Sequence, residues 1–290
     1  MKRRPLGGSV AFPRATKRIA RRADCVLNIA HRGARSLAPE NTLLAAHLGL
    51  AAGAHLWETD VAVTRDEALV LMHDDRLTRT TDVARRFPLR AHQSITTFTL
   101  QEIRCLDAGS WFLEDDPFGQ IATGAVSAES QRACQAQKVP TLEEALVWTR
   151  DHHWGINLEL KRLPRRLAHF PVVARVLATI QRVGLNLDQV AISSFNHAWL
   201  HQARGVKPTL RIQALIGENA DRPLDWGPLT FDTYNVRHTL VSDEELRQRK
   251  QAGIVINLFT VNDETDMRRY QGLGIDGLFT DFPQRLNALA

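Results

Sequence analysis

The sequence predicts an α/β protein: a TIM-type (β/α)8 barrel with a small inserted subdomain after the second barrel strand. Short apolar runs rich in β-branched residues alternate with helical patterns, as in βαβ units. Eight such runs remain when the very short run Ala68–Met72 is set aside. The chain has 290 residues, 44% of them hydrophobic, which suits one barrel of this size. The alternation favours a closed barrel, although the pattern alone does not exclude an open doubly wound sheet.

The predicted barrel strands share a core of Val, Ile, Leu and aromatic residues, bounded by turn formers or polar residues. Such continuous apolar runs are typical of parallel strands covered by helices. The expected ranges are Cys25–His31, Leu56–Val63, Gly155–Lys161, Gln189–Ser194, Arg211–Ile216, Phe231–Val236, Ile254–Val261 and Asp276–Thr280.

Capping signals mark the helices between the strands. A hydroxyl residue followed three positions later by Glu predicts a capping box, in which both side chains satisfy free backbone amides. Asn41 is expected to cap the next helix and Gly53 to end it, and Gly205 and Gly253 are expected to end two later helices. The three predicted boxes are Thr99–Glu102, Thr141–Glu144 and Ser242–Glu245.

Residues 76–139 do not fit the alternation, and we expect them to form an insertion near the mouth of the barrel. The predicted domain organisation is a basic, disordered N-terminal tail at residues 1–24 and a barrel domain at residues 25–290. Residues 1–22 carry eight basic residues and no acidic residue, so the tail holds the chain's positive charge of +5. A transit peptide for an organelle is the alternative reading of this tail.

Composition excludes several classes of protein. No basic stripe with interleaved aromatic residues predicts nucleic-acid binding, and no apolar stretch reaches the ~18 residues of a membrane span. The tail lacks the apolar run of a secretory signal, and three widely spaced cysteines suit free thiols. We therefore expect a cytoplasmic protein with no stable membrane insertion, and the sequence leaves its oligomeric state open.

Carboxylates lie near the ends of two predicted strands. Residues two apart on a strand share a face, so Glu58 lies beside Asp60, and Glu159 lies beside Lys161. Side chains at the carboxyl ends of barrel strands meet at the mouth, where active sites form. Three carboxylates there repel one another unless a cation lies between them. A set of ligands made only of oxygen atoms predicts one divalent cation, Mg²⁺ or Ca²⁺. The alternative without a metal is that these carboxylates pair with nearby arginines or face solvent.

Two histidines and two cations complete the candidate site. His31 and Arg32 end the first strand, and His73 follows the short run Ala68–Met72. Histidines with pKa values near neutrality can act as general base and general acid, while Arg32 and Lys161 suit a phosphate group. Asn262 and Asp281 follow later strands and either line the site or cap local turns.

An ordered set of short motifs resembles the glycerophosphodiester phosphodiesterase family. Any one motif is weak, but the ordered set is specific, and it covers roughly residues 29–286. The motifs are His31-Arg32-Gly33, Pro39-Glu40-Asn41-Thr42, Glu58-Thr59-Asp60, His73-Asp74, Arg79-Thr80-Thr81, Leu106–Phe112, Val139–Glu144, Asn157–Lys161, Ser193-Ser194-Phe195, Thr260-Val261-Asn262, Asp276-Gly277 and Thr280–Pro283.

The resemblance implies metal-dependent hydrolysis of a small-molecule glycerophosphodiester to sn-glycerol 3-phosphate and an alcohol. It implies that the metal ligands are Glu58, Asp60 and Glu159, that the catalytic histidines are His31 and His73, and that Arg32 and Lys161 contact the phosphate. Phe259 departs from the family, which usually has Trp there, and Asp82–Phe87 replaces a Gly-rich turn. Residues 114–138 form a longer stretch than is typical, so the head-group preference is open.

Two other functions are compatible with the sequence. One is a lysophospholipase D-like phosphodiesterase that acts on lipids at a membrane, with the basic tail attracted to anionic lipids. That enzyme needs an apolar patch near the mouth, and Phe112, Leu113 and Phe118 are the local candidates. The other is a catalytically inactive barrel that binds phosphoesters or partner proteins, which the intact set of acids and histidines disfavours.

Overall fold

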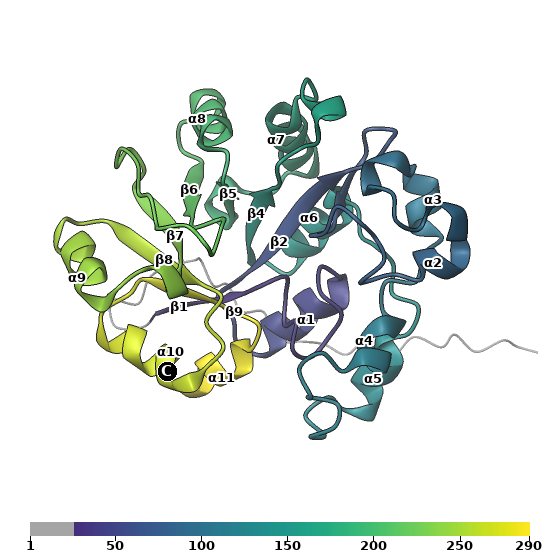
Figure 1. Cartoon of the computed structure of the whole chain (residues 1–290), viewed down its shortest axis with the longest axis horizontal. Helices are drawn as coiled ribbons and strands as arrows, with labels where there is room; N and C mark the ends of the chain where they lie inside the picture. The colour runs from purple at the N-terminus through teal and green to yellow at the C-terminus, as the bar shows by residue number, and fades with distance from the viewer. Residues whose placement is uncertain (1–25) are drawn as a thin grey trace, which may run out of the picture.

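Residues 26–290 of the computed structural model are described here, and they form a closed barrel of eight parallel strands with helices outside it (Figure 1). The predicted tail at residues 1–24, and Cys25, lie outside these residues. The barrel strands are β1 (Leu27–Ala30), β2 (Leu56–Val63), β4 (Gly155–Leu160), β5 (Val190–Ser194), β6 (Arg211–Ile216), β7 (Thr233–Arg237), β8 (Val255–Phe259) and β9 (Gly277–Thr280).

Pairing of the first strand with both neighbours closes the barrel. Ile29 of β1 is in register with Leu56 of β2, and Leu27 of β1 is in register with Gly277 of β9. The closed barrel is therefore confirmed, and the open sheet is excluded. The ends of the observed strands differ from the predicted ends by at most two residues. The short strand β3 (Leu69–Leu71) pairs antiparallel with β2 outside the barrel, as its exclusion from the eight implied.

The barrel helices follow their strands around the outside (Figure 1). Contrary to the predicted alternation, no helix lies between β6 and β7 in the described chain, and residues 217–232 form a loop there. Pro223, Gly227 and Pro228 in this loop explain the absence, because proline and glycine disfavour a helix interior. The barrel helices are α1 (Leu43–Ala51), α6 (Leu142–Asp151), α7 (Val172–Val183), α8 (His197–Val206), α9 (Asp243–Gln251), α10 (Glu264–Gly272) and α11 (Pro283–Ala288).

Two of the three predicted capping boxes are confirmed, at Thr99–Glu102 and Thr141–Glu144. In the third, Ser242 accepts from the backbone of Glu245, but the Glu245 carboxylate accepts from the indole of Trp226 at 2.8 Å instead of returning the bond. A tertiary contact therefore competes successfully with the local one.

Two other predicted helix ends are wrong. Thr42, not Asn41, caps α1, and Gly205 lies inside α8, which continues to Val206. Gly53 and Gly253 do follow the ends of α1 and α9, each in the left-handed conformation that glycine favours.

The inserted segment lies between β3 and α6, as predicted, and its domain boundaries stay a prediction. One part packs Phe98, Ile103 and Leu106 against β3, and the other packs Phe112 and Cys134 beside α1 (Figure 1). Its elements are α2 (Val83–Arg86), η1 (Pro88–Arg90), η2 (Ile95–Thr97), α3 (Leu100–Arg104), α4 (Ser110–Asp115) and α5 (Ala128–Cys134). Other 3-10 turns are η3 (Arg165–Leu167), η4 (Leu187–Gln189) and η5 (His238–Leu240).

The loop from β1 to α1 lies close against the helix that follows it. Gly33 has a φ of 84°, and a Cβ there would lie 2.5 Å from the backbone carbon of Ala45. Only glycine fits both the conformation and the space. This approach fixes Arg32, itself at a φ of 55°, at the carboxyl end of β1. None of the helices within residues 26–290 combines the length and apolarity needed to cross a membrane.

Candidate active site

Three carboxylates meet on the neighbouring strands β2 and β4. Glu58 and Asp60 point the same way from β2, and Asp60 is in register with Glu159 of β4. One oxygen atom from each of the three side chains lies within 4.8 Å of the others. The structure therefore brings together the three acids that the resemblance implied as metal ligands.

These carboxylates are held at a high electrostatic cost. Burial, together with the charges of Asp60 and Glu159, raises the pKa of Glu58 well above its usual range. Burial and the charge of Asp60 also raise the pKa of Glu159. Although burial opposes it, the neighbouring charges of Arg32 and Lys161 lower the pKa of Asp60. Positive charge at the centre of the cluster would relieve the repulsion.

Two oxygen atoms of the cluster are free to bind a ligand. Within residues 26–290, neither Glu58 Oε1 nor Asp60 Oδ1 has a hydrogen-bond partner, and both are buried. Such orphaned buried acceptors are rare unless an ion or water satisfies them. Lys161 Nζ lies 2.8 Å from Glu159 and 3.6 Å from Asp60 Oδ1, which offsets part of the charge. The donor set is all oxygen, so the residues present fit a hard divalent cation.

A histidine–aspartate pair links the residues that directly follow β1 and β9, the first and last strands of the barrel. His31 Nδ1 lies 2.7 Å from Asp281 Oδ1 across 250 residues of sequence. Despite burial, which raises it, the pKa of Asp281 is lowered to about 2 by His31 and Arg35, so this carboxylate can only accept a hydrogen bond. His31 Nδ1 therefore carries the hydrogen, and its Nε2 is left for a ligand. Asp281, which was expected either to line the site or to cap a turn, contacts the pocket-lining His31 and is not itself among the residues that line the pocket.

His73 has a similar partner from its own loop. Its Nδ1 lies 2.7 Å from Asp74 Oδ1, and Arg79 donates to the same carboxylate at 2.6 Å. Although burial raises the pKa of Asp74, hydrogen bonds from His73 and Arg79 hold it well below its usual range. The ionised Asp74 thus orients the imidazole of His73 as Asp281 orients that of His31.

Glu40 and Asn41 support the site, although the sequence reasoning gave neither of them this role. Glu40 accepts from Arg32, Arg35 and Arg79 at 2.7 to 2.8 Å, which makes it the hub of an arginine cluster. Asn41 donates to Asp60 at 2.9 Å. Both residues belong to the motif Pro39-Glu40-Asn41-Thr42. Their polar side chains, in a short loop after the first strand, are the sequence signal for a role in the site.

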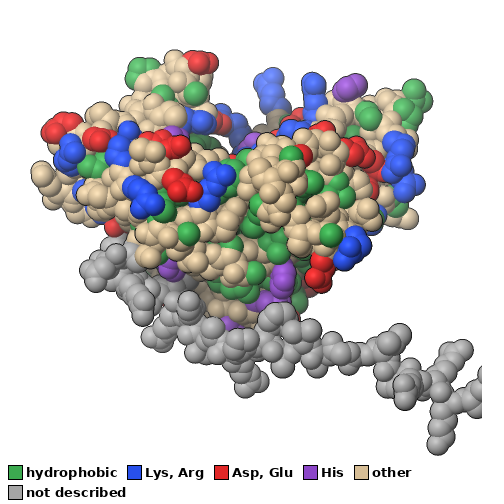
Figure 2. Space-filling view, turned by 90° about the horizontal axis from the view of Figure 1, so that it is seen from below, with side chains coloured by type: hydrophobic (Ala, Val, Ile, Leu, Met, Phe, Trp, Pro, Cys, Tyr) green, Lys and Arg blue, Asp and Glu red, His purple; other side chains and the backbone are tan. Residues whose placement is uncertain are grey.

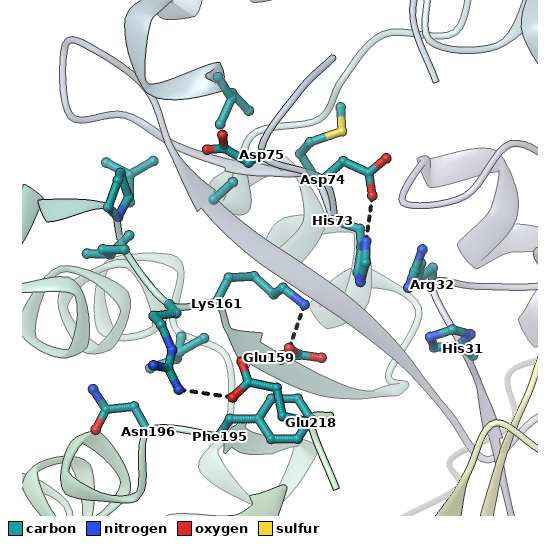
Figure 3. Close-up of a pocket in the computed structure, with 18 of the residues that line it drawn as sticks. His31, Arg32, His73, Asp74, Asp75, Glu159, Lys161, Phe195, Asn196 and Glu218 are labelled. Carbon is teal, nitrogen blue, oxygen red and sulfur yellow. Dashed lines mark hydrogen bonds and ion pairs between the residues drawn. The ribbon is translucent and has the colours of Figure 1, made fainter. Parts of the chain in front are cut away.

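The side chains border a pocket of about 600 Å³ (Figure 3). In that view His73, Arg32 and His31 follow one another along one side and face Lys161 and Glu159. Glu58 and Asp60 are buried behind this lining, at 2% and 1% exposure. All seven predicted site residues therefore lie at one place in the barrel.

Comparison with known proteins agrees with this geometry. The model of the glycerophosphoryl diester phosphodiesterase family matches residues 31–285. The chain belongs to this family. It is thus an enzyme of the phosphodiesterase class.

Curated relatives and a solved structure of the family are similar over most of the chain. A glycerophosphodiester phosphodiesterase of Bacillus subtilis is 30% identical over 271 residues, which span 90% of this chain and 85% of that protein. One from Bacillus altitudinis is 31% identical over 261 residues, 88% of this chain and 94% of that protein. An Oleispira antarctica phosphodiesterase in complex with the product sn-glycerol-3-phosphate is 27% identical, with a TM-score of 0.73 and coverage of 90% and 94%.

The positions that depart from the family pattern have ordinary structural roles or line the pocket. Phe259 lines the pocket edge-on to Phe195, with ring centroids 6.2 Å apart. Asp82–Phe87 contains the short helix α2, whose preceding residue Asp82 accepts from the backbone of Asp107 at 2.8 Å. The segment that replaces the family's Gly-rich turn therefore makes its contacts within the inserted segment.

We predict that Asp281→Asn destabilises the protein at neutral pH. A carboxylate with a depressed folded pKa contributes stability above its unfolded pKa near 4, and this is lost as pH falls through about 2. The loss at pH 7 should be about 2 kcal/mol and should shrink between pH 4 and pH 2, as measured by urea unfolding. Asp151→Asn, which removes an exposed ion pair, is the control and should change little. A difference in unfolding free energy between the wild type and Asp281→Asn that is the same at every pH would show that the charge of Asp281 does not stabilise the fold.

Proposed function

We propose that this chain hydrolyses glycerophosphodiesters to sn-glycerol 3-phosphate and an alcohol. The proposal includes one divalent cation, Mg²⁺ or Ca²⁺, held by Glu58, Asp60 and Glu159. The observation that carries it is the cluster of three carboxylates beside a pocket lined by two histidines that carboxylates orient. Two buried oxygens of this cluster have no hydrogen-bond partner among residues 26–290. The product bound to the Oleispira relative supports the glycerol 3-phosphate part.

The histidines are proposed as the general base and the general acid. Each imidazole donates Nδ1–H to an ionised aspartate, so its Nε2 can take or give a proton at the pocket side. One Nε2 would remove the proton of the glycerol 2-hydroxyl while the protonated Nε2 of the other gives its proton to the departing alcohol. The assignment of base and acid between His31 and His73 stays open.

The bond changes balance with water as the one co-reactant. The 2-hydroxyl oxygen bonds to phosphorus, and the phosphorus–oxygen bond to the alcohol breaks. Water then opens the resulting cyclic phosphate, with the two histidines in exchanged roles. A bound divalent cation supplies a Lewis acid for a phosphoryl oxygen at this place.

Arg32 and Lys161 are proposed to contact the phosphate. Arg32 is anchored by its backbone amide to Glu58 at 3.0 Å and by its guanidinium to Glu40 at 2.8 Å. Lys161 is held by Glu159, and its ammonium has donors beyond that bond. Fixed charges of this kind stabilise the growing negative charge on phosphate without reorganising.

The lysophospholipase D-like alternative gains no support from its predicted apolar patch. Phe112 is fully buried, and Phe118 packs on Phe282 at 5.4 Å and under Arg35. The large hydrophobic side chains exposed among residues 26–290 are Leu89 in η1, Val206 at the end of α8 and Leu229 in the loop before β7. The inactive-barrel alternative has no support either, because every predicted site residue is present. A cytoplasmic location stays a prediction.

The activity is tested most simply by following the release of glycerol 3-phosphate from a panel of glycerophosphodiesters, with and without EDTA. We expect turnover that EDTA abolishes and that Mg²⁺ or Ca²⁺ restores. Turnover that survives complete removal of metal would contradict the role of the cation. Faster turnover of lysophosphatidylcholine than of glycerophosphocholine would favour the lipid enzyme instead.

Replacing either histidine with alanine should lower kcat by roughly 100-fold or more, the usual size of an acid–base contribution. KM should change little, since the metal and phosphate ligands stay in place. His152→Ala is a matched control, because His152 stacks on Trp148 at the end of α6, outside the pocket. Near-normal kcat in His31→Ala or His73→Ala would remove that residue from the mechanism.

A further inference from the structure

The pocket extends beyond the proposed catalytic residues to a second group of side chains. Phe195, Asn196 and Glu218 lie on the far side of Lys161 from His31 and His73 (Figure 3). Arg237 and Phe259 line the same pocket. We refer to Phe195, Glu218, Arg237 and Phe259 as the outer wall.

Arg237 is held rigidly in the outer wall. Its Nε donates to the backbone oxygen of Gly217, and its Nη2 donates to that of Glu218 at 3.3 Å. Its guanidinium lies 5.5 Å from the centre of the Phe259 ring. Gly217 packs so closely that a Cβ there would lie 2.8 Å from Arg237 Cβ. The position of this charge is therefore set by the backbone.

The charge of Arg237 is not balanced by a nearby acid. Its hydrogen bonds go to carbonyl groups, and within residues 26–290 no carboxylate lies at ion-pair distance from it. The one acid of the outer wall, Glu218, is already paired with Arg162 at 2.9 Å. Arg162, which lines the same pocket, neutralises Glu218, so that the two arginines outnumber the one acid and Arg237 leaves a net positive charge beside the outer wall.

The same arrangement disfavours a cationic alcohol. Phe195 and Phe259 meet edge to face, as in aromatic sites that bind quaternary ammonium groups. Here Arg237 already lies against Phe259, so a second cation would meet like charge instead of an open ring. An anionic group would meet a fixed guanidinium with which it can form charge-assisted hydrogen bonds.

The rim beside the outer wall is also basic. The loop from β4 to α7 exposes Arg162, Arg165, Arg166 and His169. In the space-filling view, Lys and Arg side chains stand beside a hollow in the surface (Figure 2). Positive charge around a cleft raises the local concentration of anionic ligands.

The open side of the pocket suits the variable part of the substrate. Arg162 and Glu218 are 71% and 52% exposed, whereas Glu58 and Asp60 of the carboxylate cluster are buried. A constant glycerol group fits the enclosed side near the histidines, and alcohols of different size fit the open side. The alcohol would therefore contact the outer wall.

We propose that Arg237 is a specificity-determining residue that favours glycerophosphodiesters whose alcohol carries negative charge over those with a quaternary ammonium alcohol. The proposal rests on the proposed function, since it names the substrate class of that site.

Three substrates separate the possibilities. Glycerophosphoinositol 4-phosphate and glycerophosphoinositol differ by one anionic group, and glycerophosphocholine carries a cation. For the wild type, kcat/KM should be about tenfold higher for the phosphorylated inositol than for the neutral one, and lowest for choline. The ratio of the first two should fall as the ionic strength rises.

Substitution of Arg237 tests the residue itself. Arg237→Met keeps the packing on Phe259 and should reduce the tenfold ratio to near one, with little change for the neutral substrate. Arg237→Lys keeps the charge and should retain most of the ratio. Arg249→Met is the matched control and should leave the ratio unchanged. Arg249 lies on α9, outside the pocket, and its guanidinium is 5.0 Å from the centre of the Trp226 ring.

Each outcome supports or overturns the proposal. Choline as the fastest wild-type substrate, or an unchanged ratio in Arg237→Met, overturns it and leaves the proposed function intact. If Arg237→Met does not fold, two other results overturn the proposal. One is a wild-type ratio of kcat/KM values, phosphorylated over neutral inositol substrate, that does not change at high ionic strength. The other is the loss of this ratio in Arg237→Lys. Absence of glycerol 3-phosphate from all three substrates would reject the proposed function first and this inference with it.

Discussion

Three carboxylates, two of them buried and the third at the pocket wall, repel one another, and the rest of the site is arranged around this repulsion. Glu58 and Asp60 are almost fully buried, and the pKa of Glu58 is raised because Asp60 and Glu159 add their charges to the effect of burial. Unlike charges at close range in a protein interior interact strongly, but removing either from water is costly. The cluster is stable as ions only with compensating cations, and Arg32 and Lys161 provide part of that compensation. The unpaired oxygens are consistent with a divalent ion providing the remainder.

The fold supplies this arrangement through backbone features more than through local propensity. Parallel pairing of β2 and β4 sets Asp60 opposite Glu159, and the close approach of Gly33 to α1 carries the backbone amide of Arg32 to Glu58. Glu40 then holds three arginines around the pocket, and its pKa is kept low by them in spite of burial. Removing one member of such a network would leave buried charges without partners, which costs far more than the net value of one ion pair.

Much of the fold and the carboxylate cluster could be predicted because polar residues two positions apart on a strand must share a face. This rule predicts the grouping of Glu58, Asp60 and Glu159. The positions of His31 and His73 after predicted strands single out the two histidines, and the family resemblance implies their catalytic role. The partners of the histidines were harder to find, since Asp281 is 250 residues from His31 and only barrel closure brings them together. Asn41 looked like a helix cap, but its amide is taken by Asp60. The regular alternation predicts a helix between β6 and β7, but Pro223, Gly227 and Pro228 disfavour one there. The loop that replaces it supplies the two carbonyl groups to which Arg237 of β7 donates.

Glu58, Asp60 and Glu159 are proposed to bind one divalent ion together. A crystal soaked in Mn²⁺ tests it directly, because manganese is a hard cation with a strong anomalous signal and oxygen preferences close to those of Mg²⁺. One anomalous peak in contact with an oxygen of each acid, beside the pocket that His31 and His73 line, is the expected result. An ion bound elsewhere, or no ion at a saturating concentration, would contradict the account.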